Sequence, residues 1–259
     1  MSAEIKIVTF NLRCNVERDE INMFDNRKGL ILDKIDREMP DIIGFQEMRP
    51  QMRDYLKKHM PDYHIVGRSR SADYKGEHVD IAYRRDTISI FGLDFFWLSP
   101  TPYVPGSRYE EQSTCPRITT SGIFKHRDLD RPFRVFNTHL DHVGEQARVL
   151  GMGQILRKIT EENAKFELPV FITGDFNAKP DSETIALCNS YTEPKLTDLT
   201  ENVGPTFHAY GKSSAKIDYI FCDSATAGGC LSVEKWDDCN FGLYLSDHYP
   251  VAATVRLDD

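Results

Sequence analysis

Short polar segments follow apolar, strand-like runs at six places along this chain. For example, Ile5-Lys6-Ile7-Val8 leads into Thr9-Phe10-Asn11, and residues 168–172 lead into Gly174-Asp175-Phe176-Asn177. Apolar runs of this length are typical of half-buried or fully buried strands. Because the ends of strands that are distant in sequence can meet at one edge of a packed sheet, we expect the polar side chains to converge. The six segments are residues 9–11, 44–47, 137–140, 173–177, 216–219 and 246–250.

The converging side chains combine oxygen donors with imidazoles. A single Asp-His or Gly-Asp dipeptide is more often a solvated loop or a turn, so the argument depends on six segments occurring in one chain. Carboxylates and amides hold hard divalent cations, and such a cation beside acid–base groups is suited to hydrolysing a phosphate ester. The expected set is Glu47, Asp175, Asp218, Asp247, Asn11, Asn177, His139 and His248.

Together and in this order, the segments resemble the endonuclease/exonuclease/phosphatase superfamily, whose fold is shared by DNase I, exonuclease III, sphingomyelinases and inositol phosphatases. The resemblance runs from Ile5 to Val255, and its most specific parts are Gly174-Asp175-Phe176-Asn177 and Ser246-Asp247-His248. It implies an α/β (α+β) fold of the DNase I type, which is a four-layer sandwich of two packed mixed β-sheets flanked by helices. It also implies a site at one end of the sandwich.

A length of 259 residues fits one large domain or two small ones. No linker-like stretch divides the chain, and no cut leaves a complete set of segments in one half, so we favour a single domain over residues 1–259. No apolar stretch approaches the ~20 residues of a membrane span, and the N-terminus leads almost directly into a strand, which leaves no room for a signal peptide. The six cysteines lack metal-type spacing. We therefore expect a soluble, cytoplasmic protein with free thiols.

The net charge of −8 argues against a protein that grips duplex DNA non-specifically, since such proteins usually present a basic face. Arg68, Arg70, Arg84 and Arg85 form either a local basic patch or a solvated loop and strand edge. Repulsion of a polyanion favours small phosphorylated substrates over nucleic acid.

The hydrophobic periodicity predicts an α/β chain in which adjacent strands alternate irregularly with helices. Residues 99–116 contain four prolines and show no hydrophobic periodicity, which indicates a long surface loop. Loops of this length in compact domains are often functional. An antiparallel pair is expected from residues 118–125 and 133–138. The predicted helices cover residues 25–39, 50–60, 144–166 and 182–189, and the other predicted strands cover residues 5–11, 41–45, 63–66, 79–83, 88–97, 170–173, 217–222 and 251–255.

The resemblance implies that Glu47 is a metal ligand and that Asn11 and Asp247 accompany it around the ion. Glu47 closes an apolar strand, where its alternative role is that of a solvated acid. Because these ligands offer only oxygens and no Cys-His set has zinc spacing, Mg²⁺ or Mn²⁺ is expected. Gln46 is expected to support Glu47 rather than to touch the metal.

Asp175 and Asn177 lie two residues apart in an extended segment and should face the same way. The resemblance assigns Asp175 to deprotonating the attacking water and Asn177 to hydrogen bonding the phosphate, while an Asx turn before Pro180 is the structural alternative. His248 is expected to be oriented and kept cationic by Asp218.

His139 is expected to pair with Glu77, whose surroundings resemble the matching stretch of DNase I; otherwise Glu77 is merely exposed. Arg117 is a candidate to clamp a phosphate oxygen bidentately, or else forms a surface salt bridge. Tyr83 and His208 are further candidates for binding substrate.

Arg13 stands where exonuclease III-type enzymes carry an acid, which disfavours that subgroup and offers a phosphate-binding charge instead. A stretch similar to the DNase I subgroup is Gln46-Glu47-Met48-Arg49. Proteins of that subgroup are usually secreted, however, and we expect no secretion signal here. We therefore expect a Mg²⁺-dependent phosphoesterase that acts on a phosphorylated small molecule. The alternatives are an endo- or exonuclease acting on DNA or RNA and, more remotely, an inactive binding protein on the same fold. An inactive protein would have lost metal ligands or histidines, and none is missing here.

Overall fold

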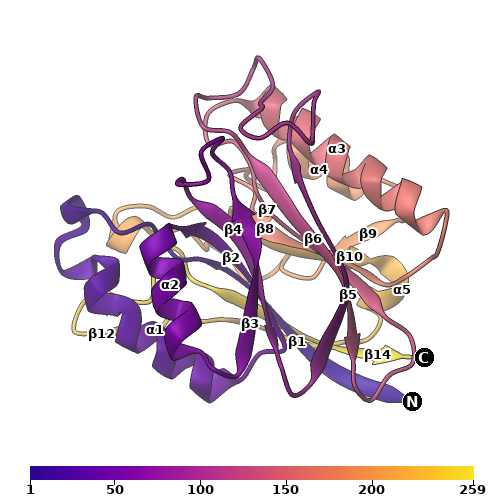
Figure 1. Ribbon diagram of the computed structural model, residues 1–259, viewed down its shortest axis with the longest axis horizontal. Helices are drawn as coiled ribbons and strands as arrows, with labels where there is room; N and C mark the ends of the chain where they lie inside the picture. The colour runs from indigo at the N-terminus through magenta and orange to yellow at the C-terminus, as the bar shows by residue number, and fades with distance from the viewer.

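Two six-stranded sheets pack face to face, and helices cover the outer face of each (Figure 1). The computed structural model describes all residues 1–259. The first sheet has the order β11-β14-β1-β2-β4-β3, with β1 (Ser2–Asn11), β2 (Ile42–Met48), β3 (Tyr63–Ser69), β4 (His78–Arg84), β11 (Cys230–Lys235) and β14 (Val251–Asp258). The second has the order β5-β6-β7-β8-β10-β9, with β5 (Ile88–Trp97), β6 (Ile118–His126), β7 (Phe133–His139), β8 (Val170–Asp175), β9 (Leu196–Asp198) and β10 (Asp218–Asp223).

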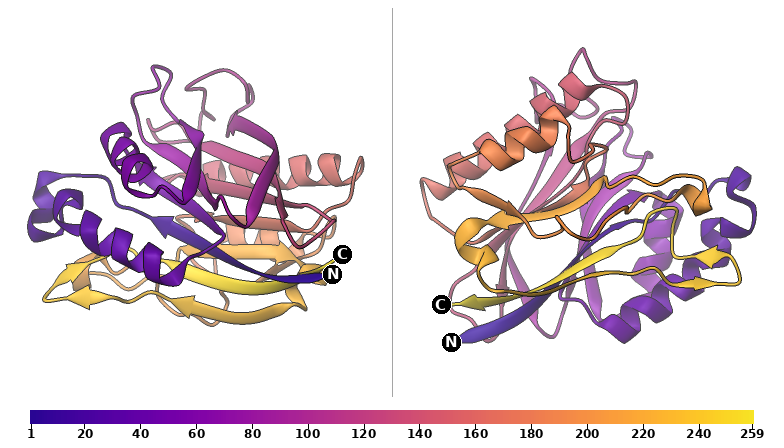
Figure 2. Two further views of the ribbon diagram at one scale, coloured as in Figure 1. Left: turned by 60° about the horizontal axis from the view of Figure 1, so that its bottom comes forward. Right: turned by 180° about the vertical axis from the view of Figure 1, so that it is seen from behind.

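Helices α1 (Phe24–Glu38) and α2 (Pro50–His59) cover the first sheet, and α3 (Glu145–Asn163) and α4 (Glu183–Ser190) cover the second (Figure 2). Helix α1 ends where Met39 adopts a left-handed conformation just before Pro40, which cannot continue a helix. Helix α2 begins with Pro50, whose fixed φ suits the first helical turn. The minor elements are 3₁₀ turns at Glu17–Asn22 and Ala209–Gly211, helix α5 (Ser224–Ala227), and the hairpin of β12 (Cys239–Asn240) and β13 (Leu243–Tyr244).

Three hydrophobic cores separate the four layers. Phe10, Ile31 and Leu56 belong to the core between the first sheet and its helices. A second core lies between the two sheets, and a third joins the second sheet to α3 and α4. The four-layer sandwich implied by the resemblance is therefore confirmed.

Each sheet contains one parallel pair of strands, and both pairs end at the same edge of the molecule. In the first sheet β1 runs parallel to β2 and Asn11 pairs with Gln46; in the second β7 runs parallel to β8 and His139 pairs with Asp175. Antiparallel β10 starts at this edge, where Asp218 lies opposite Asp175. The topology thus delivers polar residues from distant parts of the chain to one edge.

The predicted helices and strands are all present, with ends that differ by a few residues, and β6 and β7 form the expected antiparallel pair. Strands β9, β11, β12 and β13 and helix α5 were not predicted. Residues 99–116 form the expected long connection without a helix or strand. The two termini meet at the other end of the sandwich, where the Met1 amino group lies 2.9 Å from Asp259 Oδ2 (Figure 2). None of the helices combines the length with the apolar content that a membrane-spanning helix needs.

Candidate active site

A buried polar seam joins the two sheets beneath this edge. Gln46 Nε2 donates to Asn137 Oδ1 at 2.7 Å, and Asn137 Nδ2 donates to the carbonyl oxygens of Phe45 and Asp80. The sheets approach closely here because Gly44 has no side chain; a Cβ at that position would lie 2.6 Å from Asn137 Oδ1. Gln46 was expected to support Glu47, and its amide instead ties the first sheet to the second. Asn137 opens one of the six polar segments, but no role was predicted for it.

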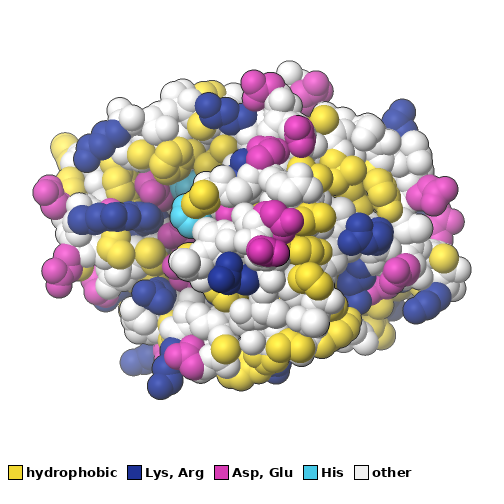
Figure 3. Space-filling model, turned by 90° about the horizontal axis from the view of Figure 1, so that it is seen from above, with side chains coloured by type: hydrophobic (Ala, Val, Ile, Leu, Met, Phe, Trp, Pro, Cys, Tyr) yellow, Lys and Arg dark blue, Asp and Glu magenta, His cyan; other side chains and the backbone are white.

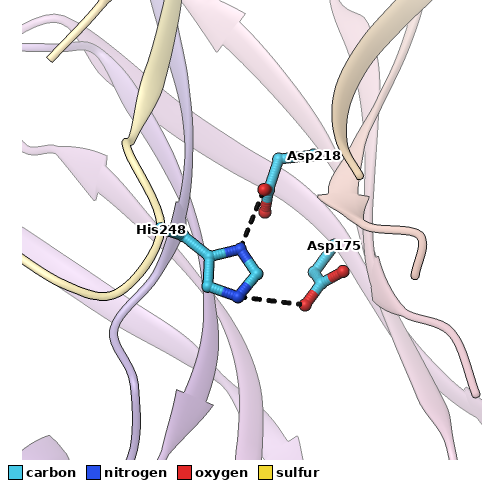
Figure 4. Close-up of side chains that lie close together, drawn as sticks. All are labelled: Asp175, Asp218 and His248. Carbon is cyan, nitrogen blue, oxygen red and sulfur yellow. Dashed lines mark hydrogen bonds and ion pairs between the residues drawn. The ribbon is translucent and has the colours of Figure 1, made fainter. Parts of the chain in front are cut away.

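His248 lies between two carboxylates (Figure 4). Its Nδ1 is 2.8 Å from Asp218 Oδ2, and its Nε2 is 3.9 Å from Asp175 Oδ2. All three side chains are buried. Their ligand-type atoms lie within 4.8 Å of one another, but both imidazole nitrogens face carboxylates, so this row is better suited to holding a proton than a metal. The Asp218–His248 pair expected from the sequence is present.

The carboxylates decide the protonation of His248. Burial alone lowers the pKa of an imidazole, but Asp218 and Asp175 outweigh it and raise the pKa of His248 to about 10. Burial raises the pKa of Asp175 to about 7, with the Asp218 carboxylate adding to this and the His248 imidazolium opposing it. His248 is therefore a cation at neutral pH, as expected.

Asn11 and Glu47 lie beside this row at the ends of β1 and β2. Asn11 Nδ2 donates to Asp175 Oδ2 at 2.9 Å and to Glu47 Oε1 at 3.3 Å. Glu47 has a φ of 58° at an irregularity in the pairing of β2 with β4, a backbone conformation that is uncommon outside glycine. Burial disfavours the ionised Glu47, but the backbone N–H of Cys14 and the cations nearby lower its pKa. Glu47 is therefore held as a carboxylate.

The oxygen donors at this edge fit a divalent cation. Asp247 is buried, and burial and the neighbouring Glu47 raise its pKa. Glu47 also raises the pKa of Asp175, so three carboxylates crowd one another, and a cation relieves this repulsion. Glu47, Asn11 and Asp247 offer oxygens only, which is the ligand chemistry of Mg²⁺ and Mn²⁺.

The expected pair of His139 and Glu77 is not formed. His139 Nε2 lies 3.4 Å from Asp175 Oδ2, whereas Glu77 Oε2 lies 2.9 Å from Arg70 Nη1. Burial, followed by the charges of Arg117 and Arg70, lowers the pKa of His139 well below that of free histidine. The neutral form of His139 is therefore favoured.

Tyr83 lies at the wrong end of its strand to bind substrate. It pairs with Ile42, whereas the opposite end of β4 lies next to Met48 and the site. Its ring packs on Phe124 between the sheets, with ring centroids 5.5 Å apart. A side chain in the core of the sandwich corrects the prediction of a substrate contact.

Asn177 and Arg13 lie at the edge with their polar groups engaged. The Asn177 N–H donates to Asp175 Oδ1 at 2.9 Å, which is the Asx turn considered from the sequence. Arg13 Nε lies 2.7 Å from Asp19 Oδ2 and 3.6 Å from Asp247 Oδ2. The Arg13 guanidinium thus faces carboxylates of its own chain.

His208 is buried beside the site within a group of aromatic rings. Its ring stacks on Tyr249 at 4.0 Å, and neither ring nitrogen has a hydrogen-bond partner. Burial and the charge of His248 lower the pKa of His208 to about 4. Its backbone N–H donates to the carbonyl of Asp247, so it lies next to the expected metal ligands.

Arg117 is 3% exposed and is not the surface salt bridge considered as its alternative role. Its Nη2 donates to His142 Nδ1 at 2.9 Å, and its Nε lies 3.6 Å from Asp141 Oδ1.

On the face seen from the top of Figure 1, histidine and acidic side chains come to the surface together (Figure 3). A concavity of about 630 Å³ near Arg131 and Arg256 contains none of the predicted site residues.

Known proteins share this architecture. The sequence model of the Endonuclease/Exonuclease/phosphatase family matches residues 8–248. An endonuclease/exonuclease/phosphatase from Bacteroides vulgatus is 30% identical with a TM-score of 0.89, covering 99% of this chain and 100% of that one. The mannosyl-6-phosphatase of Bacteroides thetaiotaomicron is 28% identical with a TM-score of 0.86, and the match covers 97% of this chain and 99% of that one.

A viral relative is similar over a shorter stretch. The protein L388 of Acanthamoeba polyphaga mimivirus is 28% identical over 160 residues, which are 60% of this chain and 59% of that curated relative's length. The family match spans most of the chain, and the two solved structures share the whole fold. The chain therefore belongs to the endonuclease/exonuclease/phosphatase family.

Proposed function

We propose that this protein is a Mg²⁺-dependent phosphoesterase that hydrolyses a small phosphorylated molecule. The single observation that carries the proposal is the convergence of the Asp218–His248–Asp175 row with Glu47, Asn11 and Asp247 at one edge of the sandwich. Members of the family depend on a divalent metal ion. The full-length similarity to a mannosyl-6-phosphatase supports a small substrate over a nucleic acid.

Glu47, Asn11 and Asp247 would hold the cation. When bound there, it supplies Lewis-acid stabilisation of the charge that develops on the phosphoryl oxygens. Arg13 holds Asp247 through a 3.6 Å ion pair, and we propose that it positions this ligand rather than contacting phosphate.

Asp175 is proposed as the general base that orients a water molecule and takes its proton. Its raised pKa makes it a stronger base than an exposed aspartate. Asn177 continues from Asp175 at the same edge and is proposed to hydrogen bond the phosphate. The cationic His248, oriented by Asp218, is proposed to stabilise the negative charge of the transition state.

His139 and His208 are proposed to have different roles in the reaction. Neutral His139 has a single N–H; its Nε2 lies 3.4 Å from Asp175 Oδ2, and the ring is proposed to orient that carboxylate. His208 is proposed to line the side of the site where the leaving group departs, because it lies beside Asp247 and its ring nitrogens are unpartnered.

Release of p-nitrophenol from two probes tests the proposal. The protein is incubated with p-nitrophenyl phosphate or bis-p-nitrophenyl phosphate, with Mg²⁺ or EDTA, and the Asp175→Asn variant is the control. We expect Mg²⁺-dependent turnover of the monoester. Turnover of the diester alone would point to nucleic acids or other diesters, and no turnover of either ester by a Mg²⁺-bound chain would count against a broad phosphoesterase.

A further inference from the structure

Two arginines lie at the site edge on the side of His139. Arg70 directly follows β3, and Arg117 directly precedes β6, so both stand where strands end beside the site. Trp97 connects them, because it pairs with Ile118 at the start of β6 and its indole Nε1 donates to the carbonyl of Arg70. The two arginines therefore lie beside one another at this edge of the molecule.

The buried guanidinium of Arg117 has free donors. Its Nε and Nη1 have no hydrogen-bond partner, although the side chain is 3% exposed. Buried donors of this kind normally have partners. The nearby carboxylate of Asp141 forms an ion pair with the guanidinium but no hydrogen bond, because its Oδ1 lies 3.6 Å from Nε while its Oδ2 accepts from the backbone N–H groups of Ser113, Val143 and Gly144. Arg117 therefore keeps buried donors that no acceptor of the protein approaches to hydrogen-bond distance, although Asp141 balances part of its charge.

Arg70 is fixed in place by its backbone and by one ion pair. Its carbonyl accepts from Trp97 Nε1 at 2.6 Å, and its backbone N–H donates to the carbonyl of Glu77. Its Nη1 lies 2.9 Å from Glu77 Oε2, and this is its single side-chain ion pair. Of the four arginines singled out in the sequence, Arg70 is the one that directly follows β3 at the edge where the site lies.

His142 adds a donor at the rim. A guanidinium can only donate, so His142 Nδ1 must accept the 2.9 Å hydrogen bond from Arg117 Nη2, and the ring proton lies on Nε2. The side chain of His142 is 52% exposed. Its Nε2–H is therefore available to a bound molecule.

We propose that Arg70, Arg117 and His142 form a receptor for the dianionic terminal phosphate of a phosphomonoester; this rests on the proposed function and names its substrate class. A terminal phosphate carries close to two negative charges at neutral pH and three acceptor oxygens, whereas a diester carries one charge and two free oxygens. The unpaired N–H groups of the two guanidiniums and the N–H of His142 match the three oxygens of the monoester. Glu77 and Asp141 offset part of the arginine charge, so the match rests on the number of donors.

Two esters with the same leaving group test the receptor. The kcat/KM of p-nitrophenyl phosphate and of bis-p-nitrophenyl phosphate is measured for the wild type and for Arg70→Gln, Arg117→Gln and His142→Ala. We expect Arg70→Gln and Arg117→Gln to lose about 10- to 100-fold on the monoester and to change little on the diester. His142→Ala is expected to show the same selectivity with a smaller loss.

Arg68→Gln is the matched control, because Arg68 stacks on Tyr74 and Phe95 on the outer strand and has no place in the receptor. Equal losses on both esters, or no loss in any variant, would overturn the receptor. If the variant of the buried Arg117 fails to fold, the Arg70→Gln and His142→Ala variants still test the receptor.

Binding of inorganic phosphate separates the receptor from turnover. In calorimetry with Mg²⁺, the wild type is expected to bind phosphate and Arg70→Gln to bind it about tenfold more weakly. A chain that binds phosphate in this way but hydrolyses neither ester would contradict the proposed function alone. A chain that hydrolyses an ester but whose phosphate affinity is unchanged by Arg70→Gln would contradict the receptor alone.

Discussion

The Asp175 carboxylate lies 2.9 Å from Asn11 Nδ2 and 3.4 Å from His139 Nε2. Replacing it with Asn keeps its size and removes the base, together with one of the carboxylates that raise the pKa of His248. We expect Asp175→Asn to lower kcat by about 10²–10⁴-fold with little change in the melting temperature. Steady-state kinetics and thermal unfolding measure the two effects, and a variant that keeps more than about a tenth of the wild-type rate would exclude Asp175 as the base.

The charge of His248, again a single residue, is expected to make the activity depend on pH. Burial lowers its pKa, and Asp218 and Asp175 raise it to about 10, so activity that needs the imidazolium falls as pH rises through about 10. Asp218→Asn removes the largest raising influence, so the alkaline limb of kcat/KM is expected to move to lower pH. An unmoved limb would show that Asp218 does not set the charge of His248.

The same shift contributes to folding stability. Because the folded pKa lies above the unfolded value of about 6.5, the contribution is complete below about pH 6.5 and is lost as pH rises through about 10.

Glu47 tests the cation site. Glu47→Gln removes one negative charge from the proposed ligands, so the Mg²⁺ concentration for half-maximal activity is expected to rise about tenfold or more, which is a loss of about 1.4 kcal/mol in binding. Glu17→Gln, an exposed acid on the neighbouring 3₁₀ turn, is the control. A metal titration that Glu47→Gln leaves unchanged would remove Glu47 from the site.

At the scale of elements, the seam between the sheets determines how precisely the two halves of the site meet. A Cβ at Gly44 would lie 2.5 Å from Thr173 Oγ1, whereas a Cβ at Gly29 in α1 meets nothing within 4 Å. We expect Gly44→Ala to cost about 1–3 kcal/mol of unfolding free energy and Gly29→Ala to stabilise by about 0.5–1 kcal/mol. Urea unfolding compares them, and a neutral Gly44→Ala would mean that the sheets can move apart without cost.

The strands with strong apolar runs were predictable because both of their faces are buried in the sandwich. Strand β9 is only three residues long, and the edge strand β11 buries too little to show a period, so neither stood out. The same limit applies to the site. The strand ends predicted that Asp175, Asp218 and His248 would lie together. They did not predict the partner of Glu77, because that partner is Arg70, which lies on the other side of the β3–β4 connection. Tyr83 was misplaced because the sequence does not say which end of an antiparallel strand lies at the site.

At the scale of the whole molecule, both sheets contribute to the site, and we accordingly propose that residues 1–259 act as one domain. The net charge of −8 then decides between substrate classes. A nuclease that contacts 6–10 phosphates loses about 10³–10⁵ in affinity between 50 and 200 mM salt. A small ester held by a few groups at one edge releases few counterions, so we expect its KM to change less than about threefold over that range. Measuring KM for p-nitrophenyl phosphate against NaCl, beside cleavage of a DNA duplex, tests this. Efficient duplex cleavage with the steep salt dependence of a polyanion binder would favour the nuclease, because it would show that local basic residues overcome the repulsion of the acidic chain.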